Sequence, residues 1–348
     1  MNDKRRKVEE FNLVKINFYE VDKEDKRFIN KSAKGKYALS FFADPLTDSN
    51  IDTAKDADIV SVFIYSILDR DNVSALPKLK LIATRSTGFN HIDLKTASAR
   101  SIPVCNVPYY GENTVAEHTF GLILALSRNI HKAYMRTTRN NFSPEGLEGW
   151  DIKGKTLGVV GAGSIGSHVI KIAKGFGMNV LAFDLHKNHF MEEVLGFTYA
   201  PLEDLLKTSD IVSLHCPYNK ATHHLINMQN IELVKRGALF INTARAGLIE
   251  PAALHHALDK GIFGGAGLDV FEGEDLVKEE NQMLTRNVSV EHLRAVLEKN
   301  ILLNRENVII TPHIAFDSVE AVERILETTM DNIEAFVAKN PTNVVNPD

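Results

Sequence analysis

The sequence predicts an α/β protein built from two doubly wound parallel-sheet domains, and three observations lead to this fold class. The 348 residues exceed the length that one hydrophobic core usually supports. Apolar strand-like runs alternate with segments of helix length, a pattern typical of parallel sheets covered on both faces. A glycine motif at 161–166 follows one such run and opens a helix.

The first part of the chain contains three strand-like runs. They are LVKINFY at 13–19, ADIVSVFIYS at 57–66 and LKLIATRS at 79–86, and the last one continues into the turn-rich TGFNHID at 87–93. These runs are rich in the β-branched and aromatic residues that favour strands. We therefore expect one small α/β domain here.

The segment 112–139 leads into a second domain. It has apolar residues at helical spacing and no proline, so it predicts one or two helices. Six strand-like runs follow: TLGVVG (156–161), NVLAFD (179–184), DIVSLHC (210–216), GALFINT (237–243), GGAGLDV (264–270) and NVIIT (307–311). Six strands with intervening helices predict a doubly wound sheet.

The composition is that of an ordinary globular protein. Hydrophobic residues make up 44%, charged residues 24%, and the net charge is −5, which argues against a nucleic-acid partner. The amino terminus lacks the apolar core of a signal peptide, no run reaches the length of a membrane span, and Cys105 and Cys216 are the two cysteines. We expect a cytoplasmic protein without disulfides, metal or membrane partner.

The motif GAGSIG is the strongest functional signal. Gly161 permits a tight turn, Gly163 lets a pyrophosphate approach the backbone, and Gly166 lets helix and strand pack closely. The helix that begins here offers free N–H groups and a positive dipole end to phosphates. The motif therefore predicts a dinucleotide site that includes Gly161, Gly163, Ser164, Ile165 and Gly166.

Asp184 ends the strand that follows this helix. Its spacing is that of the acidic residue that accepts hydrogen bonds from the adenosine ribose hydroxyls. Because its charge would repel a 2′-phosphate, NAD is favoured over NADP as the cofactor. His186 and Lys187 lie just beyond it and leave some use of NADP open.

Three ionisable residues follow later strands, where open α/β sheets bind their ligands. Singly, Arg245 is as well explained by a salt bridge at a helix start, Glu274 by loop charge and His313 by packing. Together they suit hydride transfer between a nicotinamide and a 2-oxo acid. His313 would donate the proton, Glu274 would favour its imidazolium form, and Arg245 would bind the substrate carboxylate with its planar fork.

The order of motifs resembles the D-isomer-specific 2-hydroxyacid dehydrogenases, and within them the D-lactate dehydrogenase branch. The resemblance covers nearly the whole chain. It is carried by RSTGFNHID (85–93), NVPYYGENTVAEHT (106–119), the glycine motif, SLHCPYNKATHHLIN (213–227), INTARAG (241–247), GLDVFEGE (267–274) and TPHIAF (311–316). Arg245, Glu274 and His313 match the catalytic residues of this family.

The resemblance also implies substrate and cofactor contacts. Backbone N–H groups of Thr87 and Gly88 match the loop that binds the substrate carboxylate, and Tyr65 and Tyr110 match tyrosines near the substrate. Asp269 matches the acceptor of the nicotinamide carboxamide, with a buried strand-end cap as its alternative. The other residues matched to the cofactor site are Cys216, Pro217, Thr243 and Ala244, in addition to Arg245 and His313.

Family architecture implies a Rossmann-type NAD domain at 111–313 inserted into a flavodoxin-like substrate domain formed by 1–110 and 314–348. The two connections would form a hinge, and closure would exclude water from the hydride. A homodimer through the NAD domain is implied as well. The charged insertion at 276–306 is typical of the D-lactate branch.

Other functions stay open at this point. They are a dehydrogenase for a bulkier 2-oxo acid, a short-form phosphoglycerate dehydrogenase, and an NAD(H)-sensing protein that resembles transcriptional corepressors. Formate dehydrogenases pair the histidine with glutamine, and Glu274 at that position excludes them.

Overall fold

The computed structural model describes residues 13–271, 297 and 300–346. The chain divides into two compact units, here called the first unit (Met1–Tyr110 with Val319–Asp348) and the second unit (Gly111–Ser318). The family resemblance implies a division of the chain at residues 110 and 313 into a substrate domain and an NAD domain. This division, and the ligand that each domain binds, stay predictions.

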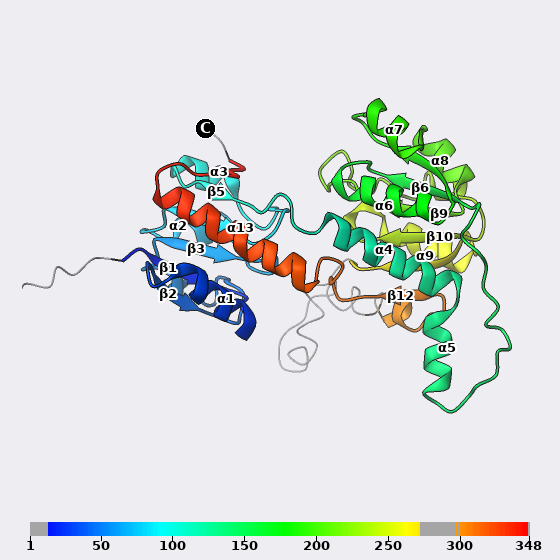
Figure 1. Ribbon diagram of the computed structural model, residues 1–348, viewed down its shortest axis with the longest axis horizontal. Coiled ribbons are helices and arrows are strands. Elements are labelled where there is room, and N and C mark those ends of the chain that lie inside the picture. The colour runs from blue at the N-terminus through cyan, green and yellow to red at the C-terminus, as the bar shows by residue number, and fades with distance from the viewer. Residues whose placement is uncertain (1–12, 272–296, 298–299, 347–348) are drawn as a thin grey trace, which may run out of the picture. The chain divides into compact units, whose positions relative to one another are not determined.

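The first unit contains a five-stranded parallel sheet (Figure 1). Its strands are β1 (Lys15–Phe18), β2 (Ala38–Phe41), β3 (Ile59–Val62), β4 (Leu81–Thr84) and β5 (Val104–Cys105). They lie in the order β2-β1-β3-β4-β5, with every neighbouring pair parallel. This is the strand order of flavodoxin-like doubly wound folds.

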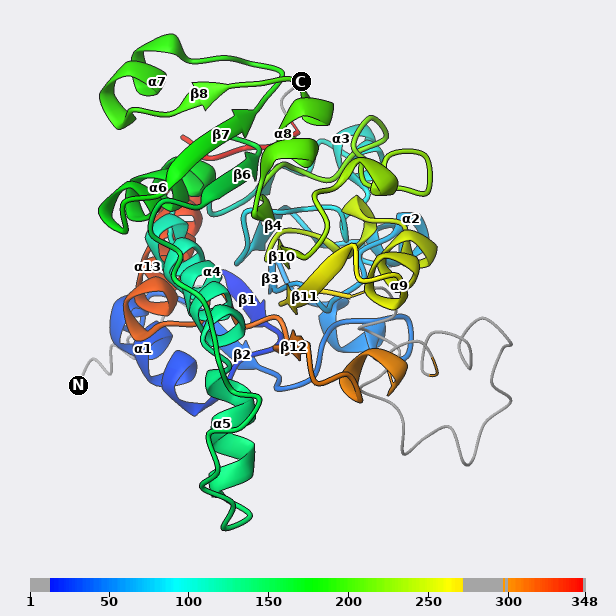
Figure 2. The ribbon, with the colours of Figure 1, turned by 90° about the vertical axis from the view of Figure 1, so that its right-hand side faces the viewer.

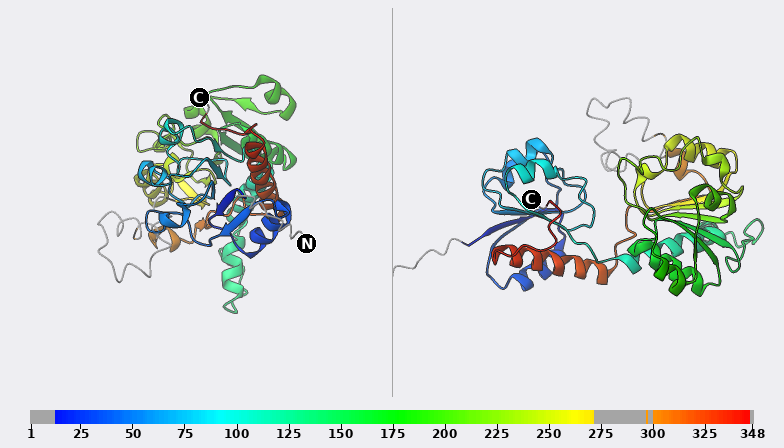
Figure 3. Two further views of the ribbon diagram at one scale, coloured as in Figure 1. Left: turned by 90° about the vertical axis from the view of Figure 1, so that its left-hand side faces the viewer. Right: turned by 90° about the horizontal axis from the view of Figure 1, so that it is seen from above.

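Helices cover both faces of this sheet. They are α1 (Lys23–Ala33), η1 (Ile51–Ala54), α2 (Arg70–Ser74), α3 (Leu94–Ala99) and α13 (Val319–Val337). Helices α1 and α13 lie on one face (Figure 3). There Leu326 and Met330 of α13 and Ile29 of α1 pack on the strands. On the other face, Val73 and Ala97 pack on strand residues that alternate with the first set, as side chains of a strand must.

The second unit contains a seven-stranded sheet. Its strands are β6 (Thr156–Val160), β7 (Asn179–Phe183), β8 (Thr198–Tyr199), β9 (Ile211–Leu214), β10 (Ala238–Asn242), β11 (Phe263–Leu268) and β12 (Val308–Ile310). The order is β12-β11-β10-β9-β6-β7-β8, and every neighbouring pair is parallel. The first strand of the unit, β6, thus lies between β7 and β9, and the direction of winding reverses there, as in Rossmann folds.

Helices again cover both faces. They are α4 (Glu112–Ser127), α5 (Ile130–Thr137), α6 (Ser164–Gly175), α7 (His189–Leu195), α8 (Leu202–Thr208), η2 (Ile231–Leu233), η3 (Ala246–Leu248) and α9 (Pro251–Asp259). Helices α4 and α6 pack against each other and on one face, whereas α8, η2 and α9 pack on the other. Helix α5 extends away from the sheet (Figure 2).

The predicted α/β fold class, with two parallel sheets, is confirmed. Every strand-like run named above overlaps a strand, whereas β2, β5 and β8 were not predicted. The segment 112–139 forms two helices. Asn129 separates them with a φ of +53°, the left-handed conformation that asparagine adopts more readily than most residues and that ends a right-handed helix.

None of the helices in the described part of the chain combines the length and apolar character that crossing a bilayer requires.

Candidate active site

The predicted cofactor residues of the second unit, together with Arg245 and His313, lie at one edge of its sheet. Because all seven strands are parallel, their carboxyl ends meet at the same edge. The residues that follow the strands there are Gly161–Gly166 after β6, Asp184 after β7, Cys216 and Pro217 after β9, Thr243, Ala244 and Arg245 after β10, Asp269 after β11, and Thr311 and His313 after β12.

The glycine turn has the geometry that its sequence requires. Gly161 has a φ of +98°, and a Cβ there would lie 2.5 Å from the backbone nitrogen of Cys216. A Cβ at Gly166 would lie 2.0 Å from the carbonyl oxygen of Gly161, so only glycine lets α6 approach this turn so closely. A Cβ at Gly163 would meet no atom within 4 Å, which leaves open space beside that backbone.

The amino terminus of α6 fits a phosphate group. Gly163 and Ser164 are exposed, and the N–H of Ser167 donates to the Gly163 carbonyl at 2.8 Å as an early helical hydrogen bond. The amides of Ser164, Ile165 and Gly166 precede it and therefore have no acceptor within the helix. Such amides, at the positive end of the helix dipole, are suited to a pyrophosphate.

Asp184 is held against the glycine turn. Its Oδ2 accepts a hydrogen bond from the Ala162 N–H at 2.8 Å, and its Oδ1 accepts one from the His186 N–H at 2.8 Å. Burial, assisted by the charge of Asp184, raises the pKa of the neighbouring Cys216 thiol to about 11. The thiol is therefore neutral at pH 7 and acts as a small apolar wall, followed by the exposed Pro217.

Arg245 lies on a braced turn after β10. The Asn242 side chain accepts from the Ala244 N–H at 3.0 Å and donates to the Arg245 carbonyl at 2.9 Å. The guanidinium Nη1 of Arg245 donates to the Ala244 carbonyl at 2.7 Å. Thr243 forms a hydroxyl–hydroxyl hydrogen bond of 3.0 Å with Thr119 of α4. These contacts fix the backbone from which Arg245 projects.

His313 has an unusual backbone conformation. Its φ of +56° is in the left-handed region, which is uncommon for residues other than glycine and clusters at functional sites. Its N–H donates to the Asp269 carbonyl at 3.0 Å, and the Phe316 ring approaches its imidazole edge-on with 6.4 Å between ring centroids. Glu274 lies outside the described residues, so its pairing with His313 stays a prediction.

Asp269 is almost completely buried, with 1% of its surface exposed. Its Oδ1 accepts from the Thr311 hydroxyl at 2.5 Å and the Ile314 N–H at 3.0 Å, and its Oδ2 accepts from the Ala315 N–H at 2.8 Å. Asp269 thus shapes the turn that carries His313. These partners favour the alternative of a buried strand-end cap, and its contact with the nicotinamide stays a prediction.

Sequence reasoning missed two histidines of this edge. His118 of α4 has its Nε2 3.1 Å from the Thr311 hydroxyl and 3.6 Å from the Asp269 carboxylate. His215 has its Nε2 2.8 Å from the Ser213 hydroxyl, and burial lowers the pKa of His215 to about 3, which keeps it neutral. Both lie in motifs named in the sequence analysis, at 106–119 and 213–227. The spacing of residues within those motifs does not predict the hydrogen-bond partners of either histidine.

The substrate residues predicted in the first unit also follow strands. Tyr65 comes after β3, and Thr87 and Gly88 come after β4. The Thr87 hydroxyl donates to the Val107 carbonyl at 2.8 Å, and the Gly88 carbonyl accepts from the Ser86 hydroxyl at 2.6 Å. Among the described residues, no group accepts a hydrogen bond from the backbone N–H of Thr87 or Gly88, so both suit an anionic ligand.

Tyr110 is the last residue of the first segment of this unit. Its carbonyl accepts a hydrogen bond from Arg324 Nε of α13 at 2.6 Å, which joins the two segments of the unit.

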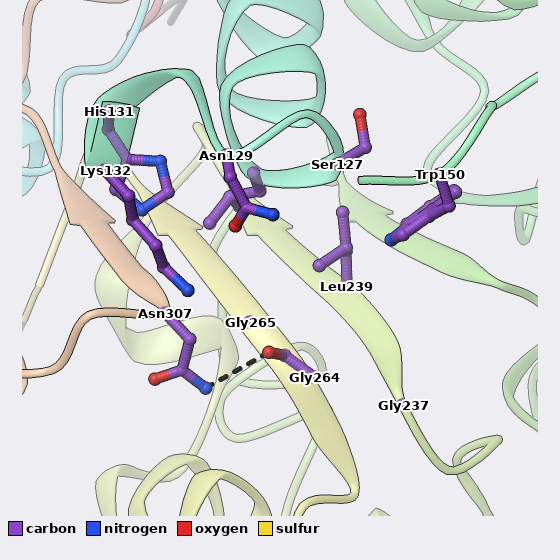
Figure 4. Close-up of a pocket in the computed structure, with 11 residues that line it drawn as sticks. Ser127, Asn129, His131, Lys132, Trp150, Gly237, Leu239, Gly264, Gly265 and Asn307 are labelled. Atoms are coloured by element: carbon purple, nitrogen blue, oxygen red, sulfur yellow. Dashed lines mark hydrogen bonds between the residues drawn. The ribbon is translucent and has the colours of Figure 1, made fainter. Parts of the chain in front are cut away.

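A cavity of about 130 Å³ lies at the opposite edge of the second sheet, at the amino ends of β10, β11 and β12 (Figure 4). Asn129 and Trp150 line it, and there Asn307 Nδ2 donates to the Gly264 carbonyl at 3.1 Å. This cavity includes none of the predicted site residues. In the described part of the chain, no group of three or more histidine, cysteine or carboxylate side chains is arranged to hold a metal.

Comparisons with known proteins identify the family of the chain. Residues 120–315 match the family model described as "D-isomer specific 2-hydroxyacid dehydrogenase, NAD binding domain". The D-lactate dehydrogenase of Escherichia coli is 37% identical over 326 residues, which cover 92% of this chain and 96% of that protein. The glyoxylate reductase of Korarchaeum cryptofilum is 36% identical over 303 residues, covering 86% and 85% of the two chains.

Among solved structures, the D-lactate dehydrogenase of Aquifex aeolicus complexed with NAD and lactic acid superposes with a TM-score of 0.86. It is 37% identical, and the match covers 96% of this chain and 99% of that one. The NAD cofactor and the family inferred from the motifs are thereby confirmed. The chain belongs to the D-isomer-specific 2-hydroxyacid dehydrogenases, as an oxidoreductase with the NAD-binding domain of that family.

Proposed function

We propose that this chain is a D-lactate dehydrogenase, which reduces pyruvate to D-lactate with NADH. The observation that carries the proposal is the shared edge of the second sheet, where the glycine turn, Arg245 and His313 follow strands of one parallel sheet. The relatives that bear the name D-lactate dehydrogenase support pyruvate as the substrate.

In the proposed reaction the cofactor, when bound, supplies the hydride. Gly161–Gly166 and Asp184 would hold it through the free amides of α6 and a carboxylate that repels a 2′-phosphate. Cys216, Pro217, Thr243, Ala244 and Asp269 would complete its site, Asp269 by keeping the turn of His313 in place.

His313 would donate a proton to the carbonyl oxygen of pyruvate as negative charge develops there. Glu274 would stabilise the imidazolium form of His313 and orient its ring. Arg245 would bind the carboxylate of pyruvate bidentately and polarise the carbonyl beside it. The N–H groups of Thr87 and Gly88 would donate to the same carboxylate, and Tyr65 and Tyr110 would contact the substrate.

The proposal includes a homodimer formed through the second unit. Helix α5 supports it, because Ile130, Tyr134 and Met135 expose 55%, 67% and 49% of their surfaces on that helix. Exposed apolar residues that gather on one element are typical of an interface. Sedimentation of the protein and of Tyr134→Glu tests this: the variant should sediment as a monomer, and a monomeric wild type would refute the dimer.

A reductase for another 2-oxo acid is the second candidate. The relative named glyoxylate reductase supports it, because it shares 36% identity over most of both chains. Selectivity for the side chain of a 2-oxo acid depends on pocket shape, in which one methylene group is worth only about 10- to 200-fold.

The test is the decay of NADH absorbance with purified protein and pyruvate, followed by chiral analysis of the product. NADPH in place of NADH checks the role of Asp184, and glyoxylate and bulkier 2-oxo acids check selectivity. Fast formation of D-lactate supports the proposal. Faster turnover of glyoxylate or a bulkier acid would favour the second candidate, and L-lactate or no turnover with any acid would refute both.

A further inference from the structure

The carboxylate of Glu20 organises the loop that carries Tyr65. Glu20 follows β1, and the loop follows the neighbouring strand β3. Its Oε2 accepts from the Phe63 N–H at 2.9 Å and from the Ser66 hydroxyl at 2.5 Å, while its Oε1 accepts from the Tyr65 N–H at 2.9 Å. One side chain therefore holds the backbone of the loop on both sides of its centre.

The backbone of Glu20 is itself in an uncommon conformation. Its φ of +56° is in the left-handed region, which is unfavourable for a residue with a Cβ. Such a conformation persists only where the surroundings impose it. The three hydrogen bonds that the Glu20 carboxylate accepts from the loop offset this unfavourable backbone conformation. We infer that the conformation is kept because it places the carboxylate against the loop.

Arg85 closes the network from the other side. It follows β4 and is buried, with 3% of its surface exposed. Its Nη2 donates to the carbonyls of Tyr19 at 2.5 Å and Glu20 at 2.8 Å, and its Nη1 donates to the Ser61 hydroxyl at 3.1 Å. Its guanidinium also lies over the Phe63 ring at 6.0 Å. Arg85 therefore ties the backbone of Tyr19 and Glu20, after β1, to Ser61 of β3.

These contacts link the ends of three neighbouring strands. Glu20 follows β1, the Tyr65 loop follows β3, and Arg85 follows β4 directly before Ser86, Thr87 and Gly88. We propose that Glu20 is a positioning residue of the enzyme, which fixes the Tyr65 loop so that it can contact a 2-oxo acid. The inference deepens the proposed function and rests on it, since Tyr65 and Thr87 are substrate contacts only if that function holds.

Charge and geometry together require glutamate at this position. The two oxygens accept from three donors, so both must be acceptors. A glutamine has the same shape but presents an NH₂ group in place of one oxygen. In Glu20→Gln one of the loop N–H groups, that of Phe63 or that of Tyr65, would therefore face another donor, and the loop would leave its place without a loss of side-chain volume.

The test compares Glu20→Gln with Asp22→Ala. Asp22 is a matched control because its carboxylate also accepts two backbone hydrogen bonds, from Glu24 and Asp25 at 2.8 Å, but they cap α1 rather than hold the loop. We expect Glu20→Gln to lower kcat/KM for pyruvate by about 10- to 100-fold, because losing a hydrogen bond to a charged group has an effect of this size. The change should lie mainly in KM, because the displaced loop would bind the substrate less tightly. NADH affinity should change by less than about twofold in both variants, and Asp22→Ala should retain the KM of the wild type.

Equal KM values for wild type, Glu20→Gln and Asp22→Ala would overturn the inference, even if the thermal stability of both variants falls. If Glu20→Gln does not fold, Ser66→Ala removes one of the three contacts, and an unchanged KM there would count against the inference. Hydrogen exchange of the Phe63 and Tyr65 amides gives a readout that needs no substrate: faster exchange in Glu20→Gln supports the bracing, and equal exchange refutes it. A wild type that reduces no 2-oxo acid would instead refute the proposed function.

Discussion

Two glycines of the same turn should separate cofactor binding from stability. In Gly166→Ala the new Cβ would lie 2.0 Å from the Gly161 carbonyl oxygen, where ordinary contacts begin at 3.4 Å. The gap of more than 1 Å must be opened by moving α6 away from the glycine turn, because the new Cβ of the helix would meet a backbone atom rather than a flexible side chain. Overpacking of this kind costs about 3 kcal/mol, well above the gain of about 1 kcal/mol from alanine in a helix.

In Gly163→Ala the new Cβ would meet no atom within 4 Å, and the φ of −71° suits any residue. Its stability should change by less than about 1 kcal/mol. The Cβ would, however, occupy the side from which the pyrophosphate approaches the amides of α6. We expect NADH affinity to fall at least about tenfold, or about 1.4 kcal/mol.

The assays are thermal unfolding and titration of NADH fluorescence on both variants. For a unit of the size of 111–318, the net loss of about 2 kcal/mol corresponds to a fall in Tm of about 4–8 °C, which Gly166→Ala should show and Gly163→Ala should not. A Tm of Gly166→Ala within about 2 °C of the wild type would refute the packing argument. NADH binding by Gly163→Ala as tight as in the wild type would refute the approach of the pyrophosphate to that glycine.

Four further predictions follow from the site. His313→Gln should lower kcat by about 100- to 10,000-fold while NADH still binds, and turnover near the wild-type rate would remove His313 from proton transfer. Arg245→Lys should lower kcat/KM for 2-oxo acids at least about tenfold because a point charge replaces a planar fork, whereas an unchanged value would contradict carboxylate binding. Asp269→Asn should lower the free energy of unfolding by about 2 kcal/mol in calorimetry, since one oxygen that accepts N–H bonds becomes a donor; an equal Tm would show that the cap is dispensable. Burial lowers the pKa of His215 from 6.5 to about 3, so its folded form stays neutral while the unfolded chain takes up a proton as the pH falls below 6.5. The stability that His215 contributes is therefore complete above that pH and declines by about 3 kcal/mol by pH 4. In urea unfolding, His215→Asn should reduce the fall in the free energy of unfolding between these pH values, and an equal fall in variant and wild type would disprove the role of His215.

The strands that the sequence predicted are those with long, buried apolar runs. β3, β9 and β10 are buried at every position, so their sequences are nearly continuous runs of apolar residues. The missed strands β5 and β8 have two residues each, and β2 lies at a sheet edge with most of its side chains partly exposed. A strand that short or that exposed depends on its neighbour for pairing and leaves little trace in its own residues.

The sequence by itself determined the family, the cofactor and the edge at which the site residues gather, because the glycine spacing and the end of a parallel strand are local properties. Only the tertiary structure decided what holds those residues. Asp269 meets its partners about 45 positions further along the chain, and the carboxylate of Glu20 meets Phe63 and Tyr65 at a similar separation. Contacts of this range depend on which strands become neighbours, and residue spacing does not encode that order.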